Sequence, residues 1–246
     1  MTFWAILPVK PLRLGKSRLA GVLDEEERFR LNQDLLKNTL LVLKAVPEVE
    51  RVLVISRDPQ VLAMARDFKA CTLQESGTRG LNTALNKATQ MARSFAVQSV
   101  LAVPADLPLI NVADIQELLA LAEHPPVVVI APDRHRRGTN ALVVNPLGAL
   151  RYAFGRNSFQ THCQEALCSE VRLEVAELPR LAVDLDTPDD LEYLRRLDTQ
   201  VNFNDSFLFA AETLRPQREL VYRQGMEKHK GFEPTRQGEH GEAQRF

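Results

Sequence analysis

From Phe3 to Ala131 the chain alternates short apolar runs with longer amphipathic segments. The apolar runs have the length and composition of strands, and they fall at residues 3–9, 51–56, around Thr72, 99–103 and 127–131. Helical spacing of apolar residues follows the cap Asp24 and recurs at residues 59–68, about 81–95 and 112–122. The alternation predicts an α/β fold with a mostly parallel sheet and helices on both faces, because parallel neighbours need a long crossover.

After Ala131 the rhythm changes. We expect strands at residues 140–145 and 171–178, and helices at 158–167 and 189–197. A returning antiparallel strand or a hairpin fits this part, so we expect a small antiparallel extension of the sheet. We assign residues 1–197 to one domain and residues 198–246 to a C-terminal extension. The extension ends in a polar, aperiodic stretch from Arg223 that is expected to be a mobile tail.

Composition excludes several classes of function. A net charge of -1 over 246 residues gives no basic face of the kind that binds nucleic acid. The three cysteines lack metal-ligand spacing and cannot all pair, which favours a reducing cytoplasm. No apolar run reaches membrane length, so we expect a cytoplasmic protein without a membrane partner. The oligomeric state is open, although Phe203, Phe207 and Phe209 would suit a homodimer contact.

Two apolar stretches run directly into aspartate and proline, namely residues 103–108 with Asp106 and residues 182–188 with Asp184 and Asp186. Proline makes the chain turn where a strand ends, so these carboxylates are expected at the rim of the sheet. Together the three could hold Mg²⁺, a hard cation that prefers oxygen ligands and phosphate partners.

Plainer interpretations of the same aspartates stay open. An Asp-Leu-Pro sequence is a common turn, and Asp184 and Asp186 could cap the final helix. Asp189 and Asp190 are expected to be acids of the first turn of that helix, outside the site.

A basic loop from Lys10 to Arg18 follows the first strand, at the edge of an open parallel sheet where ligands bind. Its Gly15-Lys16-Ser17 is not a Walker A motif, because that motif needs a glycine at position 10; a P-loop ATPase is therefore disfavoured. Lys10, Lys16 and Arg18 could still neutralise a triphosphate. The alternative is an ordinary solvated loop.

Two further segments could contact a ligand. Gly80 would let the backbone approach a nucleotide, and Asn82 offers a donor and an acceptor to a base or ribose, unless it only caps a helix. Residues 154–160 end in a helix start whose backbone N–H groups and Ser158 hydroxyl could bind an anion. Capping by Asn157 or Ser158 would explain the same residues. His162, one turn further along, is expected on the helix surface or in the core.

Six segments, in this order, resemble the guanylyltransferases of coenzyme F420 biosynthesis. They are Pro-Val-Lys with Lys-Ser-Arg-Leu, Gly-Leu-Asn, Pro-Ala-Asp-Leu-Pro, Gly-Thr-Asn-Ala-Leu, Phe-Gly-x-x-Ser-Phe and Asp-Leu-Asp-Thr-Pro, within about residues 3–197. The resemblance implies a nucleotide-diphospho-sugar transferase-like fold. It also implies transfer of GMP from GTP to phosphoenolpyruvate or 2-phospho-L-lactate, a small phosphorylated three-carbon acid, with release of pyrophosphate.

The resemblance also implies roles for single residues. Asp106, Asp184 and Asp186 would hold Mg²⁺, and Thr139, Gly155 and Ser158 would bind the phosphorylated acceptor. Arg156-Asn157 stand where the family often has a second glycine. With the basic loop included, the expected nucleotide-binding residues are Lys10, Gly15, Lys16, Gly80 and Asn82, and the expected catalytic residues are Lys16, Arg18 and Asp106.

Other functions remain open at this point. One is a nucleotidyltransferase acting on a sugar phosphate or molybdopterin, or a glycosyltransferase of the same fold that uses Asp184-x-Asp186. Another is a GTP-binding protein without catalysis. The residues alone do not choose between the two acceptors or between guanine and other bases.

Overall fold

The computed structural model describes residues 2–200 of the chain. Phe203, Phe207, Phe209 and the expected tail lie outside the described residues, so the homodimer contact and the boundary at residue 198 stay predictions. Within the described part, no helix combines the length and apolarity needed to cross a bilayer.

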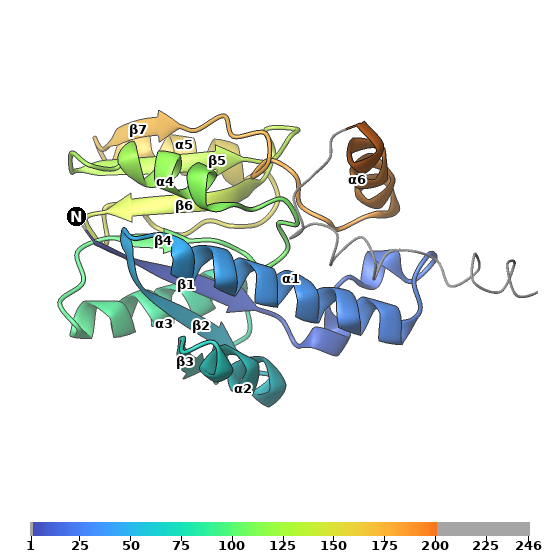
Figure 1. Ribbon diagram of the computed structural model, residues 1–246. Coiled ribbons are helices and arrows are strands. Elements are labelled where there is room, and N and C mark those ends of the chain that lie inside the picture. The colour runs from blue at the N-terminus through green and yellow to red at the C-terminus, as the bar shows by residue number, and fades with distance from the viewer. Residues whose placement is uncertain (1, 201–246) are drawn as a thin grey trace, which may run out of the picture. The chain divides into compact units, whose positions relative to one another are not determined.

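A seven-stranded sheet forms the centre of this part, in the order β3-β2-β1-β4-β6-β5-β7 (Figure 1). The strands are β1 (Phe3–Val9), β2 (Val49–Ser56), β3 (Cys71–Gln74), β4 (Val100–Ala102), β5 (Val127–Pro132), β6 (Thr139–Asn145) and β7 (Arg172–Val175). Only β6 is antiparallel to its neighbours, and the other pairs are parallel. The expected mostly parallel sheet is confirmed, and its antiparallel strand lies inside the sheet between β4 and β5.

The helices are α1 (Glu25–Ala45), α2 (Pro59–Asp67), α3 (Leu81–Ser94), α4 (Val112–Ala120), α5 (Ser158–Cys168) and α6 (Pro188–Gln200). Two 3₁₀ turns, Leu12–Leu14 and Ser17–Leu19, shape the basic loop. The expected cap of α1 is confirmed, because Asp24 and Glu27 form a reciprocal capping box. α2 begins as its sequence predicts, with Asp58 accepting from the backbone N–H of Gln60.

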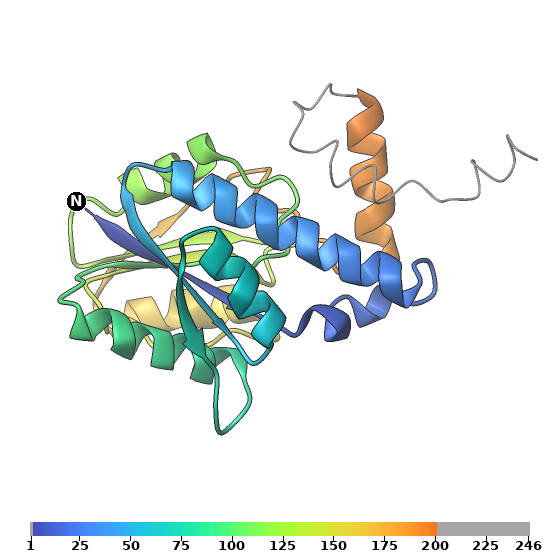
Figure 2. The ribbon, with the colours of Figure 1, turned by 60° about the horizontal axis from the view of Figure 1, so that its bottom comes forward.

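Strand β1 supplies both faces of the core, because successive side chains of a strand point in opposite directions. Phe3, Ala5 and Leu7 pack in the cluster that includes α1, α2 and α4. Trp4 and Ile6 pack in the cluster that includes α3 and α5. The helices therefore cover both faces of the sheet, and Figure 2 shows α1 and α4 on the face opposite α3 and α5.

The reversed direction of β6 matters for the location of a ligand site. The arrow of β6 points opposite to those of β1, β5 and β7 (Figure 1). Its first residue, Thr139, therefore lies at the edge where β1 and β4 end. The chain proceeds to opposite sides from β1 and β4, so the crevice at their carboxyl ends is the topological switch point at which such sheets bind ligands.

His162 of α5 is fully buried, and burial lowers its pKa from 6.5 to about 4. Because the unfolded chain protonates histidine near its ordinary pKa, it binds more protons than the folded chain between these two values. The folded state is therefore destabilised as the pH falls through that window.

We expect the free energy of unfolding of the wild type to fall by about 2 kcal/mol more than that of the His162→Asn variant between about pH 7 and about pH 5. Chemical denaturation at the two pH values measures this difference. Parallel pH dependence in the two proteins would show that folding does not lower the pKa of His162.

Candidate active site

One pocket of about 210 Å³ lies at the carboxyl edge of the sheet, at the ends of β1 and β4 and the start of β6. Five residues predicted from the sequence line it together: Asp106, Thr139, Gly155, Ser158 and Asp184. The fold thus gathers the expected acceptor residues and two of the expected metal ligands around one cavity. Pro8, Ala102 and Asn140 complete the strand-end part of its wall.

The two aspartate segments lie side by side. The backbone N–H of Leu185 donates to the carbonyl of Asp106 at 3.1 Å. A second tie holds the later segment at the sheet edge, where Asn140 Nδ2 donates to the carbonyl of Leu181 at 2.9 Å. The expected meeting of these segments at the rim of the sheet is therefore seen directly.

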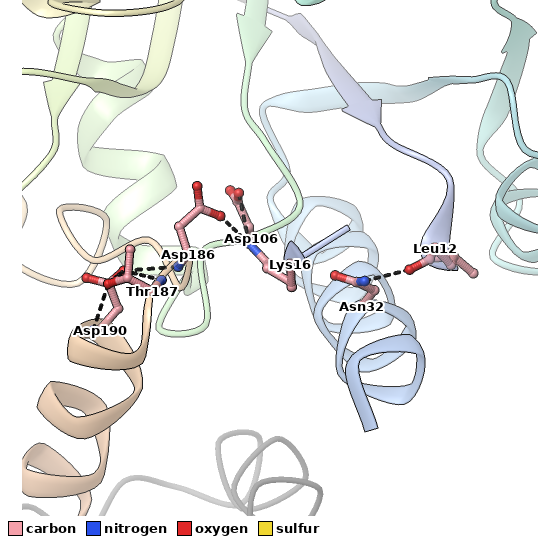
Figure 3. A network of polar contacts seen from close by, with 7 residues as sticks. All are labelled: Leu12, Lys16, Asn32, Asp106, Asp186, Thr187 and Asp190. Carbon is pink, nitrogen blue, oxygen red and sulfur yellow. Dashed lines mark hydrogen bonds and ion pairs between the residues drawn. The ribbon is translucent and has the colours of Figure 1, made fainter. Parts of the chain in front are cut away.

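Lys16 joins the two segments through its side chain (Figure 3). Its Nζ donates to Asp106 Oδ2 at 3.1 Å and to Asp186 Oδ1 at 2.9 Å, and the side chain is only 5% exposed. Burial alone lowers the pKa of Lys16, but the two carboxylates outweigh it and raise this pKa above its ordinary value. Lys16 therefore stays charged at neutral pH.

The rest of the basic loop acts on the same carboxylates. Burial tends to raise the pKa of Asp186, but the positive charges of Lys16, Lys10 and Arg18 outweigh it, and this pKa lies below its ordinary value. Burial and then the charge of Asp106 raise the pKa of Asp184 to about 6. The basic residues thus act mainly on Asp186, while neighbouring carboxylates surround Asp184 with negative charge.

The donor set fits Mg²⁺ in part. Within residues 2–200, no three carboxylate, imidazole or thiolate groups converge into a preformed metal site. Asp106 and Asp186 nevertheless converge on one cation, the ammonium of Lys16. Mg²⁺ typically takes one or two carboxylates together with substrate phosphates, so these oxygens suit an ion shared with a triphosphate. The three-aspartate Mg²⁺ site stays a prediction.

Asp190, expected outside the site, fixes the backbone next to it (Figure 3). Its Oδ2 accepts from the backbone N–H groups of Asp186 and Thr187 at 3.1 and 2.7 Å, and from Thr187 Oγ1 at 2.7 Å. Its Oδ1 accepts from Arg134 Nη2 at 2.6 Å. Asp190 is thus a buried capping residue that holds Asp186 in place, in agreement with its expected role in the helix.

Asn32 of α1 binds the basic loop through its side-chain amide (Figure 3). Asn32 Nδ2 donates to the carbonyl of Leu12 at 2.6 Å. A Cβ at Gly15 would lie 2.6 Å from that same nitrogen. A side chain at residue 15 would therefore displace the Asn32 amide, a constraint that the sequence does not reveal. The expected nucleotide contact of Gly15 stays a prediction.

Asn82 lies in the first turn of α3, and its amide binds another loop. It accepts from the backbone N–H of Phe154 at 2.8 Å and donates to the carbonyl of Phe154 at 3.0 Å. The alternative that Asn82 caps the helix is wrong, because Gly80 is the capping residue. Leu81 lines the pocket, whereas Gly80 and Asn82 do not, and their nucleotide roles stay predictions.

The start of α5 and the glycine before it line the part of the pocket where the acceptor is expected. Gly155 has φ = 142°, a conformation that favours glycine, and a Cβ there would meet open space. The expectation of free backbone donors is wrong for two groups, because Ser158 N–H donates to Gly155 and Phe159 N–H to Arg137. The cap alternative also fails for Asn157, whose side chain makes no capping hydrogen bond.

The sequence interpretation missed Asp133, which lines the same pocket. Asp133 Oδ1 accepts from the backbone N–H groups of His135 and Arg137 at 3.1 and 2.8 Å, which tightens the turn between β5 and β6. A signal was present, because Asp133 directly follows the wholly buried strand β5 and its final Pro132.

Comparisons with known proteins agree with this geometry. The model of the family described as guanylyl transferase CofC like matches residues 3–208. The phosphoenolpyruvate guanylyltransferase of Rubrobacter xylanophilus is 45% identical over 194 residues, which are 79% of this chain and 94% of the relative. The 2-phospho-L-lactate guanylyltransferase of Methanocaldococcus infernus is 33% identical over 186 residues, covering 76% and 81%. The 3-phospho-D-glycerate guanylyltransferase of Colwellia psychrerythraea is 31% identical over 196 residues, covering 80% and 92%.

A solved structure from Desulfovibrio desulfuricans G20, assigned as a nucleotide-diphospho-sugar transferase, matches with a TM-score of 0.69 at 18% identity, covering 91% of this chain and 98% of that one. This likeness confirms the expected fold. The range matched by the family model covers the sheet and every pocket residue named above. The chain therefore belongs to the guanylyl transferase CofC-like family.

Proposed function

We propose that this guanylyltransferase moves GMP from GTP to phosphoenolpyruvate, or to a closely related phosphorylated three-carbon acid, and releases pyrophosphate, as a step of coenzyme F420 biosynthesis. The observation that carries the proposal is the single pocket that joins Asp106 and Asp184 to Thr139, Gly155 and Ser158. Phosphoenolpyruvate is put first because the relative with 45% identity is named for it.

The reaction needs no nucleophilic side chain. An ionised oxygen of the acceptor phosphate attacks the α-phosphorus of GTP, and the bond from that phosphorus to the bridging oxygen breaks. The electron pair of that bond leaves with pyrophosphate. The protein must therefore hold two anions in line and offset their mutual repulsion.

The residues divide this work between the pocket and the basic loop next to it. Lys10, Lys16, Arg18 and Asp186 do not line the pocket, but Lys16 binds Asp106, which does. Lys16 is a buried permanent charge beside Asp106 and Asp186, and Lys10 and Arg18 add positive charge close by. We assign the triphosphate to this side. Mg²⁺, held by Asp106, Asp184 and Asp186, would supply charge compensation for the triphosphate.

We assign the acceptor to the part of the pocket lined by Thr139 and Ser158, where it would meet hydroxyl groups and no cation among the described residues that line the pocket.

Location in the cytoplasm and assembly as a homodimer remain part of the proposal. Cys71, Cys163 and Cys168 are free thiols, which suits a reducing compartment.

The acceptor is tested by offering GTP with phosphoenolpyruvate, 2-phospho-L-lactate and 3-phospho-D-glycerate, singly and as an equimolar mixture. We expect pyrophosphate release and a guanylylated product with the highest kcat/KM for phosphoenolpyruvate. Mass spectrometry of the product from the mixture identifies the preferred acid. Turnover with hexose phosphates and with none of the three acids would favour the rival nucleotidyltransferase function instead.

The carboxylate side is tested by Asp106→Asn, which keeps the size of the side chain and removes its charge. We expect kcat to fall at least about a hundredfold, because Asp106 is a proposed ligand of Mg²⁺ and the variant loses the charge compensation that this ion would give the triphosphate. The Mg²⁺ concentration needed for half-maximal turnover should rise in parallel.

Asp189→Asn is the matched control for this experiment, since Asp189 is an exposed acid of α6 that does not line the pocket. It should leave both quantities within about twofold of wild type, and circular dichroism should show both variants folded. Wild-type protein that binds GTP without turnover would support the non-catalytic alternative, whereas unchanged turnover after Asp106→Asn would contradict the proposed role of Asp106.

The anchoring of Asp186 is tested by two substitutions of Asp190. Asp190→Ala removes the acceptor of three hydrogen bonds at residues 186 and 187, so we expect a loss of about 1–2 kcal/mol in the free energy of unfolding and a lower kcat. Asp190→Asn retains an amide oxygen at this position and should therefore keep more of the free energy of unfolding and more of kcat than Asp190→Ala. Denaturation and turnover assays measure the order, and equal effects of the two variants would contradict it.

A further inference from the structure

His162 makes two hydrogen bonds that together determine the position of its proton. The backbone N–H of Ala153 donates to His162 Nε2 at 3.0 Å. His162 Nδ1 lies 3.0 Å from Thr139 Oγ1, and this contact is also a hydrogen bond. The ring is fully buried between the start of β6 and the loop before α5.

The hydrogen bond from Ala153 determines which group donates in the hydrogen bond between His162 and Thr139. A backbone N–H can only donate, so Nε2 must present a lone pair and carries no proton. A neutral imidazole then carries its proton on Nδ1, and burial keeps the ring neutral. Nδ1–H therefore donates to Thr139 Oγ1, and the threonine hydroxyl is the acceptor in this pair.

Because Thr139 Oγ1 accepts the hydrogen bond from His162, the hydroxyl proton of Thr139 is free to be donated to another group. Thr139 lines the pocket, and within residues 2–200 its hydroxyl has no other hydrogen-bond partner than His162. We propose that His162 is a positioning residue that fixes the Thr139 hydroxyl as a hydrogen-bond donor toward an anionic oxygen of the acceptor acid. This inference rests on the proposed function, because it takes the acceptor to bind at Thr139.

The same ring also fixes the opposite wall of the acceptor side. The edge of the His162 ring packs on Phe154, with ring centroids 4.9 Å apart and an angle of 74°. The Phe154 backbone is held in turn by Asn82. One imidazole thus connects the loop that carries Gly155 to Thr139. This connection positions the Thr139 hydroxyl relative to Gly155.

Two substitutions separate the two hydrogen bonds of His162. The amide nitrogen of His162→Asn can take the place of Nδ1 and still donate to Thr139. The amide oxygen of His162→Gln can take the place of Nε2 and still accept from Ala153. Thr139→Val has nearly the shape of threonine without its hydroxyl and completes a double-mutant cycle.

We expect His162→Gln to raise KM for the acceptor about tenfold while KM for GTP stays within about twofold. His162→Asn should lie closer to wild type in acceptor KM. Combined with Thr139→Val, His162→Gln should add less than about a twofold effect, because the hydroxyl it orients is already absent. Multiplying effects in the double variant, an equal rise in KM for GTP, or equal impairment by Asn and Gln would overturn the proposal.

A second measurement does not depend on turnover. Two-bond ¹H–¹⁵N correlations of ¹⁵N-histidine-labelled protein should show His162 protonated at Nδ1 and bare at Nε2 near neutral pH. A proton on Nε2 would overturn the inference whatever the activity. Wild-type protein that guanylylates no three-carbon acid would instead overturn the proposed function, and with it the acceptor role of Thr139, so the two failures are distinguishable.

Discussion

The ion pairs of Lys16 hold the site together. Its ammonium is withdrawn from water, which is costly for any charge, and two carboxylates from distant parts of the chain compensate for that cost. Asp106 belongs to the segment after β4 and Asp186 to the segment before α6, so one side chain from the first loop connects three parts of the fold. The hydrogen bond from Leu185 to Asp106 and the contacts of Asp190 keep the two carboxylates within its reach.

Local signals in the sequence predicted the elements well. Asp24 and Asp58 cap the helices that follow them, and the apolar runs are the strands of the sheet. The aspartate-proline segments were placed correctly at the rim, although only the Asp106 segment follows a strand, and the later segment is bound beside it through Leu185. The caps and the apolar runs depend on neighbours in sequence, and for that reason they can be read without the structure.

Features that depend on pairing between distant residues could not be read in this way. Nothing near Thr139 shows that its strand enters the sheet between β4 and β5. Only a folded chain brings Asn82 to Phe154 or Asn32 to Gly15. Asn82 and Gly15 were predicted from their motifs to contact a nucleotide, and the structure adds a contact of each with a distant part of the chain.

The reversed strand has a consequence for how such a site can diversify. Because β6 runs against its neighbours, the acceptor side is built from one continuous stretch, residues 139–162, while Lys10, Lys16 and Arg18 come from the first loop. The proposed roles thus assign the two substrates to separate portions of the sequence. Under this assignment, the acceptor stretch could vary while the basic loop stays the same, a modular arrangement within a single sheet.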